Sequence, residues 1–111
     1  MDNLIKVGGG VHNYSTQEHI VGKWIDGSDV YEKTYTASVT SGTTTLDTEK
    51  KGLVISADGC LVSSDNRIFF ICFMNSTAEK YLYCYYTTDS YKFNLTTNLA
   101  GTVYLTIRYT K

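Results

Sequence analysis

Short runs of β-branched and aromatic residues, separated by turn signals at intervals of about ten residues, fill the chain from residue 30 to its end. In the last run an apolar side chain occupies every second position: Val103, Leu105, Ile107 and Tyr109. Such alternation puts one face of a strand in a core. Strands and turns at this spacing are typical of a sandwich or jelly roll. The sequence therefore predicts an all-β fold, an antiparallel β-sandwich of jelly-roll type.

Three local patterns add detail to this expectation. Asp58-Gly59 lies between two β-prone runs and predicts a two-residue hairpin turn. The stretch from Arg67 to Met74 is apolar on both faces, which predicts a central strand. Ser15 followed by Glu18 is a capping-box pattern and predicts one or two helical turns before Gly22. The core expected from the alternation comprises Phe70, Cys72, Leu82, Cys84, Val103, Leu105 and Ile107.

With 111 residues the chain has the length of one domain. Residues 1–22 include Gly8-Gly9-Gly10 and show no strand pattern, so we expect a linker or N-terminal extension there. The head domain is then expected to span residues 23–111. No signal peptide is visible at the N-terminus, and no apolar run reaches the length of a membrane span.

Charge and cysteine content restrict the possible partners. The formal net charge is −1, so the chain lacks the basic excess that binds nucleic acid or anionic membranes. Cys60, Cys72 and Cys84 form no metal-binding motif, and we expect neither a metal site nor another cofactor. We interpret the cysteines as buried small apolar residues, which fits assembly in a reducing cytoplasm.

We expect no catalytic residues. His12 and His19 are the two histidines, and neither belongs to a nucleophile–base motif such as GxSxG. Most acidic residues, among them Asp26, Asp58 and Asp89, lie in predicted turns, where aspartate stabilises the backbone. The sequence therefore favours a binding or structural protein over an enzyme.

Tyrosine is the most informative residue type, with ten copies. Its ring and hydroxyl suit binding surfaces, including stacking on sugars. Tyrosine is also a favoured strand residue. Outward-facing tyrosines could therefore form a ligand surface or a subunit interface, and the sequence leaves both open.

One stretch, Tyr14 to Thr34 (YSTQEHIVGKWIDGSDVYEKT), resembles the YSxxE…GxWiDG…YxKt segment of modules near the end of bacteriophage and prophage tail-fibre or baseplate proteins. The last strand, Leu105 to Lys111, is similar to the closing strand of those modules. This chain departs from the pattern at Ser28-Asp29, where Lys-Pro is common, but it keeps Asp26-Gly27 as the turn. The middle, residues 37–100, carries no resemblance.

The resemblance implies a virion protein of the phage tail, assembled in the bacterial cytoplasm as a homotrimer that contacts the host surface. We expect Trp24, Ile25 and Tyr31 at the three-fold contact. Because binding residues usually occupy loops on a rigid scaffold, we expect a host glycan, or a host protein, to meet the loops 75–79 and 87–91. The residues predicted to contact it are Asn75, Tyr86, Asp89 and Tyr91. The alternative is a monomeric carbohydrate-binding module of a secreted bacterial protein.

Overall fold

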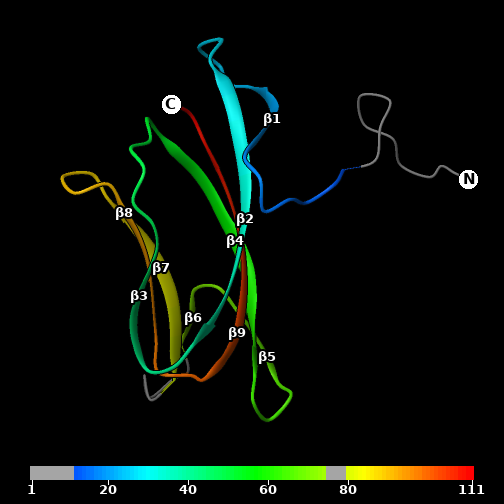
Figure 1. The fold of residues 1–111 in the computed structure, drawn as a ribbon, viewed down its shortest axis with the longest axis vertical. Helices are drawn as coiled ribbons and strands as arrows, with labels where there is room; N and C mark the ends of the chain where they lie inside the picture. The colour runs from blue at the N-terminus through cyan, green and yellow to red at the C-terminus, as the bar shows by residue number, and fades with distance from the viewer. Residues whose placement is uncertain (1–11, 75–79) are drawn as a thin grey trace, which may run out of the picture.

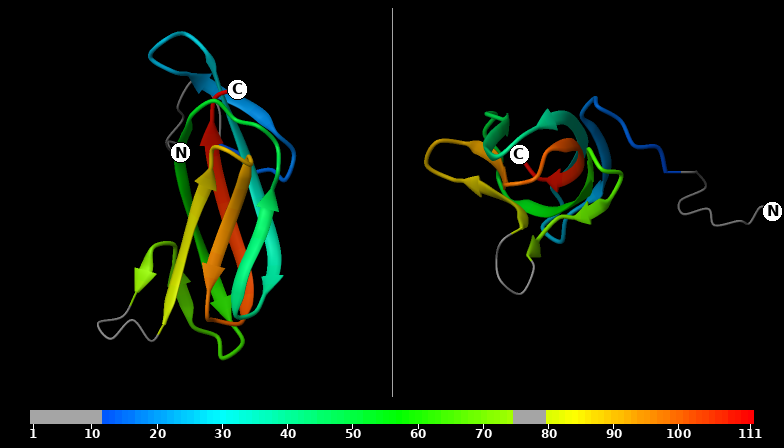
Figure 2. Two further views of the ribbon diagram at one scale, coloured as in Figure 1. Left: turned by 90° about the vertical axis from the view of Figure 1, so that its left-hand side faces the viewer. Right: turned by 90° about the horizontal axis from the view of Figure 1, so that it is seen from below.

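The computed structural model describes residues 12–74 and 80–111, and the described chain forms two antiparallel sheets and no helix (Figure 1). The five-stranded sheet has the order β1 (His19–Lys23), β2 (Asp29–Val39), β9 (Gly101–Tyr109), β4 (Val54–Ser63), β5 (Ile68–Phe70). The four-stranded sheet has the order β3 (Gly42–Asp47), β8 (Lys92–Thr97), β7 (Tyr81–Thr87), β6 (Phe73–Met74). The sheets pack face to face (Figure 2), so the predicted all-β sandwich is confirmed. No helix of the described residues could cross a membrane.

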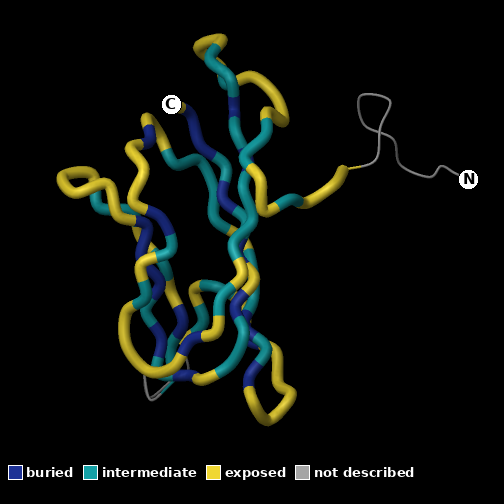
Figure 3. The backbone as a smooth tube through the Cα atoms, viewed as in Figure 1, coloured by how far each residue is buried: buried dark blue, intermediate teal, exposed yellow. Residues whose placement is uncertain are grey.

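The core lies between the two sheets in two neighbouring apolar clusters. One cluster gathers Val39, Leu61, Phe69, Leu82, Leu95, Leu99 and Val103. The other gathers Phe93, Leu105, Ile107 and Tyr109. The predicted alternation in β9 is confirmed, because its four apolar side chains are buried while Tyr104 between them is exposed. Figure 3 shows the exposed residues concentrated in the connecting turns and the N-terminal segment.

Two of the seven predicted core residues are wrong. Phe70 is 70% exposed and Cys72 is also exposed, whereas Cys84 is half-buried against the second cluster. The stretch from Arg67 to Met74 is not one central strand. It forms two short edge strands, β5 in one sheet and β6 in the other, and Cys72 between them has a φ of 69°. An edge strand has a neighbouring strand on one side only. Its apolar side chains, such as Phe70, are therefore partly exposed.

The predicted hairpin at Asp58-Gly59 is also wrong, because β4 continues through both residues and pairs with β9 along its whole length. Gly59 serves a different purpose. A Cβ at this position would lie 2.0 Å from the carbonyl oxygen of Tyr104, so the glycine permits a close approach of two backbones.

The predicted helical turns at Ser15–Val21 are replaced by an extended segment that leads into β1. The Ser15 hydroxyl accepts a hydrogen bond from the Gln17 N–H at 2.9 Å, as a capping residue would. The Glu18 carboxylate does not complete the box. It accepts from the Tyr109 hydroxyl and pairs with Lys111 Nζ at 2.6 Å. These long-range contacts, with β-branched Ile20 and Val21, favour the strand.

The different surroundings of Cys72 and Cys84 predict different reactivity. Burial, with a contribution from Cys72, raises the pKa of the Cys84 thiol to about 11. Because the thiolate is the nucleophile, we expect iodoacetamide at pH 8 to alkylate exposed Cys72 at least about tenfold faster than Cys84. Peptide mass spectrometry over time would measure both rates. Equal rates in the folded protein would contradict the assigned burial. In guanidinium, which unfolds the chain, the two rates should become equal.

Candidate functional site

The described part of the predicted N-terminal extension lies against the head domain. Residues 12–18, here called the N-terminal arm, run along the outer side of β2 before the chain enters β1 (Figure 1). The Thr34 N–H of β2 donates to the Ser15 carbonyl at 2.8 Å, so the arm continues the hydrogen bonding of the sheet. The arm is therefore attached by backbone as well as by side-chain contacts.

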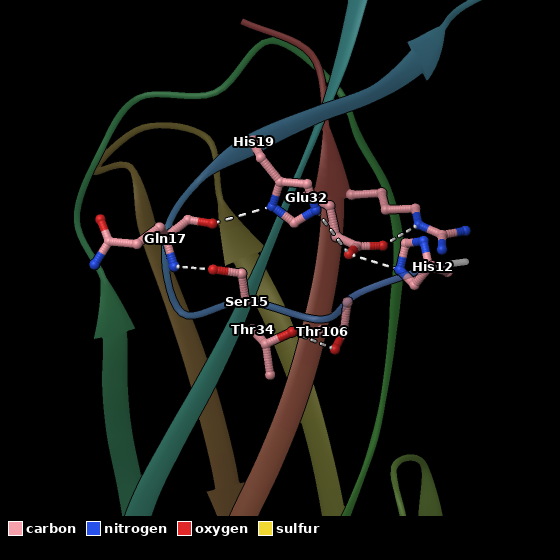
Figure 4. Close-up of polar contacts among 8 residues, drawn as sticks. His12, Ser15, Gln17, His19, Glu32, Thr34 and Thr106 are labelled. Carbon is pink, nitrogen blue, oxygen red and sulfur yellow. Dashed lines mark hydrogen bonds and ion pairs between the residues drawn. The ribbon is translucent and has the colours of Figure 1, made fainter. Parts of the chain in front are cut away.

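A buried carboxylate joins the arm to the sheet. Glu32 of β2 is 0% exposed although it faces away from the core. Its Oε1 accepts from Nε2 of His12 at 2.9 Å and lies 3.4 Å from Nε2 of His19, while Oε2 accepts from Nε of Arg108 at 2.8 Å (Figure 4). His19, Glu32 and Arg108 are register partners on β1, β2 and β9. Both histidines of the chain thus contact one structural ion cluster.

The β1–β2 hairpin projects from the end of the sandwich. As the sequence predicts, Asp26-Gly27 forms its turn: Gly27 has a φ of 89°, and the Trp24 N–H donates to the Ser28 carbonyl at 2.8 Å. Ile25 at the tip is 92% exposed, Ile20 and Val21 on β1 are exposed, and Trp24 is half-buried. Tyr31, the third predicted interface residue, is half-buried and stacks on Tyr109 with a centroid distance of 6.1 Å.

Three of the four predicted ligand residues, Tyr86, Asp89 and Tyr91, lie in or beside the turn that follows β7. Asn75 lies outside the described residues. The predicted loop 75–79 lies outside them too, so the structure describes one of the two predicted loops, the turn Thr88–Tyr91 after β7. The turn lies at the end that also carries the β1–β2 hairpin and the C-terminus, rather than at an opposite, distal end (Figure 1).

Tyr86 and Tyr91 both contact the segment between β3 and β4. The Tyr86 hydroxyl accepts from the Lys51 N–H at 3.0 Å, and Lys50 Nζ lies 5.7 Å from the centre of the Tyr91 ring. Tyr91 has a φ of 58° and is 38% exposed. Asp89 is exposed in the same turn. The turn after β7 is thus linked to a lysine-bearing segment that the sequence analysis did not consider.

Those lysines border a polar cavity of about 440 Å³, here called the lysine pocket. It lies among the arm, β2, the β3–β4 segment and the C-terminal end of the chain. Its lining consists of Thr16, Gln17, Glu18, Lys33, Glu49, Lys50, Lys51, Tyr109 and Lys111. A pocket of this volume is large enough for a small ligand such as a mono- or disaccharide.

Hydrogen bonds and ion pairs hold the floor of the lysine pocket. Lys51 is buried, and its Nζ lies 3.2 Å from Asp47 Oδ2, 3.0 Å from the Glu49 carbonyl and 4.9 Å from the Tyr109 ring centre. Burial acts to raise the pKa of Asp47, but hydrogen bonds from Tyr35, the Glu49 N–H and Lys51 outweigh it and lower that pKa. The pKa of Glu18 is likewise lowered, since bonds from Lys111 and Tyr109 outweigh its burial. Both carboxylates are therefore ionised at neutral pH.

A row of tyrosines covers the outer face of the four-stranded sheet. Tyr81, Tyr83 and Tyr85 occupy alternate positions of β7, and their ring centres are 6.0 and 6.3 Å apart. Tyr83 and Tyr85 are exposed, and Thr96 and Asn94 face them on β8. This tyrosine row is an aromatic strip bordered by the Thr96 hydroxyl, while the Asn94 side chain beside it is buried.

Comparison with family models, with curated proteins and with solved structures yields no match to this chain. The candidate site is therefore assigned from its own geometry. Sequence reasoning missed the lysine pocket because its residues come from four separate segments. The charged run Asp47–Lys51 was the one local signal that could have indicated it.

Proposed function

We propose that this chain is a non-catalytic tip module of a bacteriophage tail fibre, which forms a homotrimer and contacts a glycan on the host surface. The observation that carries the proposal is the exposed apolar surface of the β1–β2 hairpin. The segment that resembles tail-fibre modules forms this hairpin, and its Ile20, Val21 and Ile25 lie outside the core clusters. Exposed apolar groups gathered on one projecting element favour a protein interface.

The position of the hairpin is also suitable for a closed trimer. Among the described strands β1 is at the edge of its sheet, so subunit contacts can cover its outer side. If the three hairpins meet at the three-fold axis, each contacts its two neighbours through two different faces, because a three-fold interface is heterologous. Trp24 and Ile25 are the anchors we expect, and Tyr31, stacked on Tyr109, would support them from beneath.

The tyrosine row and the turn Thr88–Tyr91 support contact with sugars. Aromatic rings with neighbouring hydroxyl groups are suited to stacking and hydrogen bonding with a glycan. Trimerisation would multiply weak single-site binding by roughly 10²–10⁴ in avidity. Adsorption of the labelled protein to candidate host cells tests this part directly, and a protein that adsorbs to none and binds no arrayed glycan would contradict it.

The trimer is tested by light scattering after size-exclusion chromatography. At about 100 μM we expect a mass three times the 12.4 kDa of one chain. Ile25→Asp should produce monomers, with at least about a thirtyfold weaker association, because it puts a charge in the centre of the contact. Ile25 is 92% exposed in the isolated chain, so the variant should keep the circular dichroism spectrum of a sandwich.

Ile68→Asp is the matched control, since Ile68 is 58% exposed on β5, at the far edge of the same sheet. It should remain trimeric. A monomeric wild-type chain would remove the trimer and favour the second candidate, a monomeric carbohydrate-binding module. The tyrosine row is the observation that favours this alternative, because such an aromatic strip can bind a polysaccharide without any partner subunit.

A further inference from the structure

We propose that the lysine pocket binds an acidic saccharide, whose anionic group is neutralised by Lys33 and Lys50. This inference extends the proposed function by naming the chemical class of the glycan and its binding site. It rests on the proposed function only in taking the ligand to be a sugar. The lysines whose charges are not already neutralised within the chain are the ones available to an anionic ligand.

Two of the four lysines in the pocket have carboxylate partners. Lys111 Nζ pairs with Glu18 at 2.6 Å, and Lys51 Nζ lies 3.2 Å from Asp47. Lys33 and Lys50 make no ion pair within residues 12–74 and 80–111; their ammonium groups lie 5.1 and 5.7 Å from the ring centres of Tyr35 and Tyr91. Glu49 is the one unpaired carboxylate in the lining of the described pocket. The pocket therefore keeps an excess of positive charge in a chain whose net charge is −1.

The remaining lining suits the neutral part of a sugar. Thr16 supplies a hydroxyl and Gln17 an amide, while Tyr109, which is 1% exposed, fixes the base of the pocket. The Tyr109 ring is fixed before any ligand arrives, because its hydroxyl donates to Glu18 and Lys51 lies beside it. A preformed pocket loses little conformational entropy on binding. Ammonium groups beside hydroxyl and amide groups match a uronic acid or a sugar phosphate.

The test is an NMR titration of the ¹⁵N-labelled full chain. The probes are digalacturonate for the carboxylate form, glucose 1-phosphate for the phosphate form and galactobiose as the neutral control. We expect an acidic probe to shift the amide signals of Gln17, Lys51 and Lys111 with a dissociation constant of about 1 mM, a value typical of single-site sugar binding. Galactobiose should bind at least about tenfold more weakly. Adding 0.5 M NaCl should weaken binding of the acidic probe, because salt screens exposed charges.

The double variant Lys33→Gln/Lys50→Gln should bind the acidic probe about tenfold more weakly, because it loses two partly exposed charge contacts. Lys92→Gln, which removes an exposed lysine outside the pocket, should bind the acidic probe as tightly as the wild-type chain does. Three results would overturn the inference. They are equal binding of the acidic and neutral probes, an equal loss of affinity in Lys92→Gln, and no shift of the pocket amide signals at 20 mM acidic probe. Host adsorption that the double variant retains would overturn it too, while leaving the proposed function intact. Binding of the acidic probe by a chain that is monomeric at about 100 μM would uphold the pocket and contradict the proposed function.

Discussion

Replacing Gly59 by alanine is expected to lower the free energy of unfolding by about 3 kcal/mol, because the new methyl group has no space. The added Cβ would lie 2.0 Å from the carbonyl oxygen of Tyr104 and 2.8 Å from the Cα of Leu105. Both atoms belong to the backbone of β9, so no side-chain rotation can relieve the contact. Strands β4 and β9 must separate locally, next to Leu105 and Ile107 of the core.

Urea unfolding followed by circular dichroism measures this change, and the midpoint of thermal unfolding should fall by about 12 °C. Gly22→Ala is the matched control. Gly22 also lies in a strand of the same sheet, and a Cβ there meets nothing within 4 Å. Its effect should stay within about 0.5 kcal/mol. If the two variants were equally stable, the close approach of β4 and β9 would be wrong.

Gly59 also illustrates how far the sequence predicts this fold. Alternation is local, so the apolar face of β9 and the all-β class followed from it directly. Strand β9 decides whether Asp58-Gly59 forms a turn or continues a strand. The β9 residues that pair with Asp58 and Gly59 lie more than forty residues further along the chain. A local turn signal cannot reveal that a distant backbone requires the same glycine. The prediction of one central strand over Arg67–Met74 was wrong for a related reason, since the division of this stretch between two sheets depends on tertiary pairing.

The candidate site was less predictable than the fold. The turn at Asp26-Gly27 followed from local sequence. The lysine pocket did not, because Lys33, Lys50 and Lys111 are brought together only when β2, the β3–β4 segment and the chain end meet. Glu32 occupies an outward position of β2, which by alternation predicts an exposed charge. Its burial arises from the N-terminal arm and from β1, neither of which the pattern of β2 can reveal.

Replacing Glu32 by glutamine is expected to release the N-terminal arm and to lower the free energy of unfolding by about 2 kcal/mol. The wild-type carboxylate accepts bonds from His12 and Arg108 and lies within 3.4 Å of His19. Glutamine has one acceptor oxygen, and its NH₂ group would face one of these donors. Removing one partner of a buried ion cluster costs about 3–5 kcal/mol when the remaining charges stay buried. The cost is smaller here because the side chains of His12, His19 and Arg108 are 39, 33 and 43% exposed and can be hydrated.

Hydrogen exchange of the Thr34 amide separates arm release from general destabilisation. This N–H donates to the Ser15 carbonyl of the arm, whereas the amides of the β2–β9 ladder do not depend on the arm. In Glu32→Gln the Thr34 amide should exchange at least about tenfold faster, while the Leu105 amide in β9 should remain among the slowest. Glu49→Gln, which neutralises an exposed carboxylate, should leave the Thr34 amide unchanged. Unchanged Thr34 exchange in Glu32→Gln would mean that the backbone bond to Ser15 holds the arm without the ion cluster.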